Sequence, residues 1–265
     1  MDDSRESIKE ISLCLSGGGA RGPFHIGVLA YIEEHNIQVK AISGTSIGAL
    51  IACAHASGVK ADKMFETFSS KAFKKMIRYS FSFKSLLKLV LNDKVISQLL
   101  RVQNLEELKI PTYVTYISLE DGNIIRQNRG DILDNILRSM ALFPAFEPIV
   151  GEDKVTYCDG GVLDNLPIKP LQDYPYKIVS VNLHPDTTFV NKGFISILKR
   201  VFFLAWRSSI RDSIANSDIY ITSTELARFN ILLFKGDRAL YELGYASAKK
   251  RFEGFWYNTS KKDCQ

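Results

Sequence analysis

The chain has 265 residues, of which 46% are hydrophobic and 24% are charged, and its formal net charge is +5. These are ordinary proportions for a globular protein, and they exclude a disordered chain, which would combine lower hydrophobicity with higher charge. The basic excess is too small to indicate a nucleic-acid-binding protein, so we expect no nucleic-acid partner.

No targeting or membrane-spanning segment is visible in the sequence. The chain begins MDDSRESIKE, which lacks the apolar stretch of a signal peptide. The most apolar later window, 194–206, is interrupted by Lys199 and Arg200, whereas a membrane span needs about 20 apolar residues. Four scattered cysteines form no metal-binding or redox pair. We therefore expect a cytoplasmic protein with reduced thiols, no metal site and no cofactor.

Strand-like and helix-like runs alternate along the chain. Helices are expected to open at Pro23 and Ser46 and to cover 132–142 and 238–252, while 62–100 is expected to be helical or irregular. Short strands are expected at 11–15, 39–43, 112–118, 155–158, 177–183 and 219–222. This alternation predicts a three-layer α/β/α fold around a mostly parallel sheet. No linker interrupts it, so we expect one domain over 1–265.

Ser46 occupies the centre of a G-x-S-x-G motif that begins at Gly44 and ends at Gly48. The motif falls between an expected strand and an expected helix, which is the setting of a nucleophile elbow. The glycines let strand and helix approach closely, and the helix dipole favours negative charge near the hydroxyl. We interpret Ser46 as a nucleophile; an ordinary turn with Ser46 as the helix cap is the alternative.

A glycine-rich loop, SGGGARG, follows the first expected strand and covers residues 16–22. Consecutive glycines expose backbone N–H groups and allow positive φ angles, so such a loop suits an anion. A dinucleotide site would need an acid near the end of the second strand, and a P-loop would need Gly-Lys-Ser/Thr; neither is present. The neighbouring serine favours a tetrahedral oxyanion. Arg21 is expected to brace the loop or to meet a substrate phosphate.

Two residues are candidates for the base that Ser46 needs. Asp159 ends an expected strand and precedes Gly160 and Gly161, which leave room for its carboxylate to face the serine. Burial would raise the pKa of Asp159 and make it a better base. His184 would instead complete a serine–aspartate–histidine triad in α/β-hydrolase order. The early position of the serine, after only two strands, weighs against that triad. Packing or surface roles are expected for the remaining histidines, His25, His35 and His55.

Three motifs in this order resemble those of the patatin-like phospholipases: the glycine loop 17–22, the serine motif 44–48 and Asp-Gly-Gly at 159–161. Their flanks fit as well, with FPAFEP before the aspartate and GVLDNLP after it. Three ordered motifs are far more specific than any one of them. The similarity spans about 10–185, and the C-terminal helices expected at about 190–265 match only loosely.

The resemblance implies a calcium-independent lipid acyl hydrolase of the phospholipase A or lysophospholipase type. It implies a Ser46–Asp159 dyad acting through an acyl-serine on a phospholipid or lysophospholipid. The oxyanion would be held by backbone N–H groups of Gly17, Gly18 and Gly19. Supporting positions would be Arg21, Gly22, Gly44, Gly48, Gly160 and Gly161. Two alternatives stay open: an esterase that uses His184, and a membrane-lipid-binding protein with weak or no hydrolysis.

The net positive charge is concentrated in two segments, 67–92 and 187–211, which contain Lys and Arg but no acid. Both are also rich in Phe, Leu and Ile. Two amphipathic helices with solvated lysines would explain this pattern. An interfacial surface for anionic head groups is the other interpretation, and it predicts peripheral contact with an anionic membrane. In the first segment, that contact would involve Lys74, Lys75 and Arg78.

Overall fold

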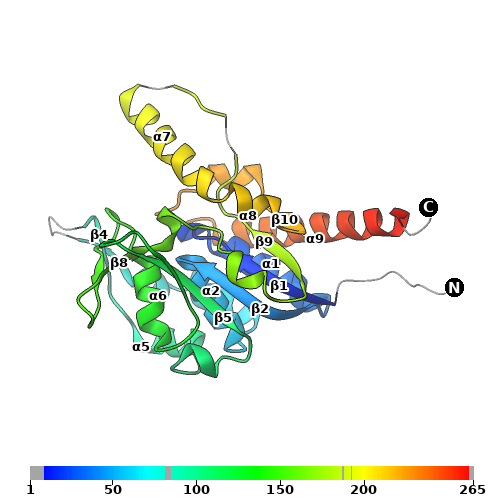
Figure 1. The fold of residues 1–265 in the computed structure, drawn as a ribbon, viewed down its shortest axis with the longest axis horizontal. Coiled ribbons are helices and arrows are strands. Elements are labelled where there is room, and N and C mark those ends of the chain that lie inside the picture. Colours follow the sequence, from blue (N-terminus) through cyan, green and yellow to red (C-terminus); the bar gives the residue numbers. More distant parts are fainter. Residues whose placement is uncertain (1–8, 81–84, 187, 192, 263–265) are drawn as a thin grey trace.

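The computed structural model describes residues 9–80, 85–186, 188–191 and 193–262. Its centre is a mostly parallel sheet with helices on both faces, which confirms the predicted α/β class (Figure 1). Five neighbouring strands are parallel, in the order β10, β9, β1, β2 and β5. Their bounds are Ile219–Ile221, Lys177–Val181, Glu10–Leu15, Gln38–Thr45 and Thr112–Ser118.

Three further strands, each in an antiparallel pairing, extend the sheet around β5. Strands β6 (Ile124–Gln127) and β8 (Thr156–Asp159) both pair with β5, and β7 (Ile149–Val150) pairs with β8. The sequence prediction included β8 but neither β6 nor β7. Strand β7 has only two residues and β6 has four, so neither offers enough alternation for a period of two to be visible.

Strands β2 and β8 lie end to end along one edge of β5. Successive residues of a strand direct their backbone hydrogen bonds to opposite edges. The carbonyl of Pro111 accepts from β2, and the N–H of Leu119 donates to Thr156 at the start of β8. The N–H of Ser118 points to the other edge and donates to Asn123, just before β6. Because β2 runs parallel and β8 antiparallel to β5, their carboxyl ends meet.

Side chains along β1 point alternately to the two faces of the sheet, so they belong to two separate hydrophobic clusters. Ile11, Leu13 and Leu15 belong to the larger cluster, and Cys14 belongs to a smaller cluster on the opposite face. The smaller cluster is closed by the 3-10 turn Lys169–Leu171 and by residues at the start of α8 (Arg211–Ala215). The larger cluster contains residues of α1 (Pro23–Glu34), α2 (Ile47–Ala56), α6 (Ile132–Met140) and α9 (Asp237–Lys262).

Helix α9 packs directly on α1, backbone against backbone. A Cβ at Gly27 would lie 1.9 Å from the carbonyl oxygen of Tyr241, and one at Gly244 would lie 2.0 Å from that of Phe24. Phe252 of α9 is fully buried in the same core as the sheet. The C-terminal helix, whose motif similarity is loose, is therefore part of the main hydrophobic core.

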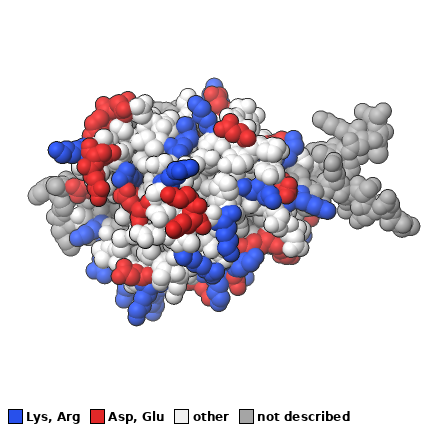
Figure 2. All heavy atoms as spheres, turned by 60° about the horizontal axis from the view of Figure 1, so that its bottom comes forward, with Lys and Arg blue, Asp and Glu red and all other residues white. Residues whose placement is uncertain are grey.

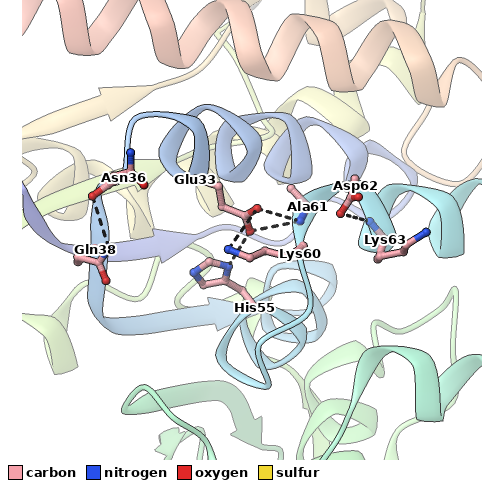
Figure 3. Close-up of polar contacts among 8 residues, drawn as sticks. All are labelled: Glu33, Asn36, Gln38, His55, Lys60, Ala61, Asp62 and Lys63. Carbon is pink, nitrogen blue, oxygen red and sulfur yellow. Dashed lines mark hydrogen bonds and ion pairs between the residues drawn. The ribbon is translucent and has the colours of Figure 1, made fainter.

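Helix α1 also fixes the start of α3 (Ala61–Ser69) through Glu33 (Figure 3). The Glu33 carboxylate accepts from the N–H of Ala61 at 3.2 Å and 3.3 Å and faces Lys60. His55 at the end of α2 lies 3.8 Å from the same carboxylate, and burial lowers the pKa of His55 to about 4. This histidine therefore has a packing role, as the sequence suggested.

The basic segment 67–92 is not an amphipathic helix. It contains the end of α3, the short helix α4 (Lys71–Lys74) and a two-stranded hairpin of β3 (Ile77–Tyr79) and β4 (Leu87–Leu89). The sequence prediction missed this hairpin because each strand has three residues, and Leu and Lys are common in helices as well. Lys84 lies outside the described residues. Helix α5 (Asp93–Leu99) follows.

The second basic segment, 187–211, forms helix α7 (Phe194–Ser209), which projects from the body at the top of Figure 1. Several large apolar side chains on it are exposed, including Phe194, Val201 and Leu204. Lys192 and the side chains of Lys199 and Trp206 lie outside the described residues. Within the described part of the chain, no helix combines the length and apolar character that a bilayer crossing requires.

Candidate active site

Ser46 stands at a sharp turn between β2 and α2. Its backbone angles are φ 55° and ψ −125°, in the left-handed region that a residue with a side chain seldom occupies. Glycines make the turn compact: a Cβ at Gly48 would lie 2.4 Å from the Leu15 carbonyl oxygen, and one at Gly44 would lie 2.6 Å from the Gly48 backbone. The predicted strand–turn–helix elbow is therefore present, with Ser46 at its apex.

A second serine holds this strained turn in place. The N–H of Ser46 donates to Oγ of Ser139 on α6 at 2.8 Å, and that hydroxyl donates to the carbonyl of Thr115 at 2.6 Å. Ser139 is fully buried. The sequence prediction missed it, because Ser139 lies outside the motifs and only the packing of α6 on β5 brings it to the elbow.

Asp159, at the carboxyl end of β8, lies beside Ser46. Its Oδ1 accepts from the N–H of Gly161 at 2.7 Å, and both this hydrogen bond and the nearby Ser46 side chain lower the pKa of the carboxylate. Asp159 is 2% exposed, however, and burial has the larger effect and raises its pKa to about 6. A carboxylate with this pKa is ionised at neutral pH and is a stronger base than an exposed one.

The sheet topology explains why two residues so far apart in sequence meet. Thr45 at the end of β2 pairs with Thr115, and Asp159 at the end of β8 pairs with the next residue, Tyr116. The two strands thus deliver Ser46 and Asp159 to the same point on β5. The chain continues past this point through Gly160, and a Cβ on Gly160 would lie 2.5 Å from the Thr115 carbonyl oxygen.

The glycine loop lies against the other side of Ser46. A Cβ at Gly17 would be 3.2 Å from Cβ of Ser46, so the loop backbone passes directly beside the hydroxyl-bearing residue. Gly19 has a φ of 55°, and a Cβ there would lie 2.2 Å from the Ile231 carbonyl oxygen. The N–H groups of Gly17, Gly18 and Gly19 have no hydrogen-bond acceptor within the described ranges. Gly22 packs against Ile47 at the start of α2.

Arg21 holds the glycine loop in place through hydrogen bonds to two other segments of the chain. It is buried, its Nη1 donates to the carbonyl of Leu183 at 2.7 Å, and its Nε and Nη2 donate to that of Phe229 at 3.0 Å and 2.8 Å. Of the two roles considered from the sequence, bracing is the one that these contacts match. The guanidinium ties the loop both to the end of β9 and to the segment before α9.

Ser46 and Asp159 lie at the wall of a cavity that is lined mainly by apolar side chains. Its few polar contributions come from the glycine loop, Ser46, Asp159, Asn165 and His184. The apolar wall comes from several elements that lie far apart in the sequence. Its members include Leu50, Met76, Ile77, Leu87, Leu89, Leu137, Leu142, Phe146, Leu232 and Phe234. A cavity of this composition suits a long hydrocarbon chain.

Asn165 was not singled out from the sequence, yet it lies between the two glycine segments of the site. Its Oδ1 would be 2.6 Å from a Cβ at Gly17 and 2.8 Å from one at Gly161. The residue is 3% exposed, and its Nδ2 has no partner among the described residues. The sequence indicates that Asn165 belongs to the site only through its position six residues after Asp159, in the segment GVLDNLP.

His184 lines the same cavity. Burial, with the nearby charge of Arg21, lowers the pKa of His184 to about 3, while a hydrogen bond to the backbone of Gly17 opposes this shift. The imidazole is therefore uncharged at neutral pH. His25 is buried behind the loop and contacts the carbonyl of Ser16 at 2.8 Å, so it has a packing role.

Cys14, Cys53 and Cys158 are buried free thiols, and Cys158 lies directly before Asp159. Burial raises the pKa of the Cys158 thiol, which makes it less reactive. Within the described ranges, no three His, Cys, Asp or Glu side chains gather in a way that would hold a metal ion.

The family model of the patatin-like phospholipases matches residues 13–171, and the chain belongs to this family. An uncharacterized NTE family protein of Mycobacterium tuberculosis is 27% identical over 168 residues, which are 62% of this chain and 46% of that protein. A lysophospholipase of Mycosarcoma maydis is 29% identical over 167 residues, which are 60% of this chain and 9% of that protein.

The chain thus spans less than half the length of these relatives. Among solved structures, VipD from Legionella pneumophila superposes with a TM-score of 0.55 at 15% identity, covering 93% of this chain and 67% of VipD. This similarity supports the fold alone.

Proposed function

We propose that the protein is a lipid acyl hydrolase of the phospholipase A or lysophospholipase type. The observation that carries the proposal is the placement of Ser46, at a strained and partly exposed elbow, beside the buried carboxylate of Asp159 at the wall of an apolar cavity. The family, together with a relative named as a lysophospholipase, supports a phospholipid or lysophospholipid as the substrate class.

In the proposed mechanism, Asp159 takes the proton of the Ser46 hydroxyl as Oγ attacks the ester carbonyl carbon. The resulting oxyanion accepts hydrogen bonds from the N–H groups of Gly17, Gly18 and Gly19. Collapse breaks the ester bond, and protonated Asp159 gives its proton to the departing alcohol oxygen. Asp159 then takes a proton from water as the water oxygen attacks the acyl-serine carbonyl carbon. When the bond to Ser46 breaks and the fatty acid leaves, Asp159 returns this proton to Oγ of Ser46.

The position of the Asp159 carboxylate beside the Ser46 side chain favours a dyad, because it needs no imidazole between nucleophile and base. We propose in addition that no calcium is required, since this chemistry is supplied by side chains and backbone N–H groups. Excess chelator should then leave the rate unchanged.

The test measures fatty-acid release from phospholipids and lysophospholipids and labelling of Ser46 by a fluorophosphonate. Wild type should turn over substrate and become labelled, whereas Ser46→Ala should do neither and Asp159→Asn should lose at least 10³-fold in kcat. Absence of both turnover and labelling in the wild type would reject the hydrolase and leave a lipid-binding protein.

His184→Ala distinguishes the dyad from the triad. Since the dyad needs no histidine, the variant should keep most of its kcat. A loss as large as that of Asp159→Asn, with folding intact by circular dichroism, would establish the triad in its place.

A further inference from the structure

The β3–β4 hairpin has two chemically different faces. Ile77, Leu87 and Leu89 line the catalytic cavity. Arg78 and Lys88 alternate with these residues, are exposed, and are directly opposed cross-strand partners. Because side chains along a strand point alternately to its two faces, the hairpin separates the apolar cavity from a cationic outer surface.

The cations on this outer surface repel one another. Arg78 and Lys88 are like charges in one cross-strand pair, an arrangement that costs stability. Lys71 and Lys75 are one helical turn apart, with the N–H of Lys75 donating to the Lys71 carbonyl at 3.1 Å, and this spacing is also repulsive. No ion pair in the described part of the chain neutralises any of the four. The folded protein therefore contains an uncompensated cationic cluster.

Three of these cations line a groove in the surface. Its polar wall consists of Lys71, Lys75, Arg78 and Asn92, and Nε of Arg78 donates to the Lys75 carbonyl at 3.1 Å. Its apolar wall includes Met76 and Leu91, and both residues also line the catalytic cavity. The cationic groove and the cavity that would receive an acyl chain therefore share two wall residues, Met76 and Leu91.

Exposed apolar side chains lie in the same segment as the cations. Leu86 is 60% exposed, Leu91 39% and Tyr79, next to Arg78 in the chain, 77%. On the face drawn in Figure 2, basic and acidic groups are interspersed. Cations combined with exposed aromatic and aliphatic side chains are typical of a surface that meets lipid head groups and the acyl boundary together.

We propose that the groove of Lys71, Lys75 and Arg78, with Lys88 beside it, docks the protein on the phosphate groups of an anionic lipid surface. The proposal rests on the proposed function, because it names the surface from which the acyl hydrolase draws its substrate. It also revises the sequence expectation: Lys74 is not part of the site, since it is paired with the buried carboxylate of Asp237 on α9.

The test measures vesicle binding in a Ser46→Ala background, so that binding does not depend on hydrolysis. The parent should bind vesicles of phosphatidylcholine mixed with phosphatidylglycerol far more tightly than vesicles of phosphatidylcholine alone, and added salt should weaken this binding. A variant with Lys71→Gln, Lys75→Gln and Arg78→Gln should lose affinity for the anionic vesicles by roughly a hundredfold, at roughly fivefold per charge. Its thermal midpoint should be unchanged or higher, because repulsion is removed.

The matched control changes Lys154, Lys250 and Arg251 to Gln, which removes the same charge from exposed positions elsewhere. It should bind nearly as well as the parent. An equal loss in the control, or equal binding to both kinds of vesicle, would overturn the proposal. Competition by inorganic phosphate at constant ionic strength would also overturn it, in favour of a free-anion site. If the wild type hydrolyses lipid but does not bind anionic vesicles, only the docking proposal is rejected. If it binds anionic vesicles but hydrolyses no lipid, only the proposed hydrolase function is rejected.

Discussion

At the scale of single residues, burial of Asp159 disfavours the ionised form of its carboxylate. The proposed role of Asp159 as a base explains why the residue is buried nevertheless. The residue is 2% exposed, and its pKa is raised from 3.8 to about 6. A base must be ionised to accept the Ser46 proton, so kcat/KM should rise with pH through about 6 and level off above it. An assay from pH 5 to pH 8 on a soluble short-chain ester tests this expectation. A profile that does not change across pH 6 would exclude Asp159 as the base.

The same pKa shift predicts a change in stability. The folded state holds the Asp159 proton more tightly than the unfolded state, so this residue's contribution to stability is lost as pH rises from about 4 through 6. Two pKa units correspond to about 3 kcal/mol. Asp159→Asn should therefore be inactive yet more stable than wild type at pH 8, with a smaller difference at pH 5. Urea unfolding at both pH values measures this, and a pH-independent difference would contradict the raised pKa.

At the scale of secondary-structure elements, the contact of α2 with β1 fixes the position of the nucleophile. A Cβ at Gly48 would lie 2.4 Å from the Leu15 carbonyl oxygen and 2.6 Å from that of Ser16. Because both neighbours are backbone atoms, Gly48→Ala must displace α2 from the sheet. We expect a loss of roughly 3 kcal/mol in the free energy of unfolding, together with most of the activity.

Gly254 in α9 provides the matched control, since a Cβ there would meet nothing within 4 Å. Gly254→Ala should stabilise the helix by about 1 kcal/mol and leave activity unchanged. Chemical unfolding and ester hydrolysis measured on both variants test the pair. If Gly48→Ala were as stable and as active as Gly254→Ala, close packing at the elbow would not be required for stability or for activity.

At the scale of the whole molecule, the C-terminal helix and the motif-bearing part share one core. Leu240, Ala248 and Phe252 of α9 are buried in the same cluster as Ile11 and Leu13 of β1. We therefore predict that 1–265 unfolds as a single domain, with far-UV circular dichroism and fluorophosphonate labelling of Ser46 changing at the same denaturant concentration. Gly244→Val, which would force α9 away from α1, should shift both transitions together. Separate transitions would indicate two domains.

Sequence reasoning predicted the long elements of the fold and the short strands β8 and β10, and it missed the short strands β3, β4, β6 and β7. Strands β1, β2 and β5 and helices α1, α2 and α6 lie where the pattern placed them, because each has enough residues for its period to be visible. The hairpin of β3 and β4 was missed because strands of three residues carry almost no periodic signal. Segment 67–92 was consequently open to interpretation as a helix.

By itself, the sequence determined the chemistry that each motif carries. Gly44, Ser46 and Gly48 specify an elbow, the loop 16–22 specifies exposed N–H groups, and Asp159 with its two glycines specifies an unobstructed carboxylate. Each depends on local backbone geometry, and local geometry is encoded in a few consecutive residues.

Only the tertiary structure decided which groups meet and what surrounds them. Ser46 and Asp159 lie side by side because β2 and β8 converge on one edge of β5, and Ser139 supports the elbow because α6 packs there. The tertiary structure also determines the surroundings of the basic residues. Lys74 is paired with Asp237, whereas Lys71, Lys75 and Arg78 line a groove. These outcomes depend on contacts between residues far apart in the chain, and no short stretch of sequence encodes such contacts.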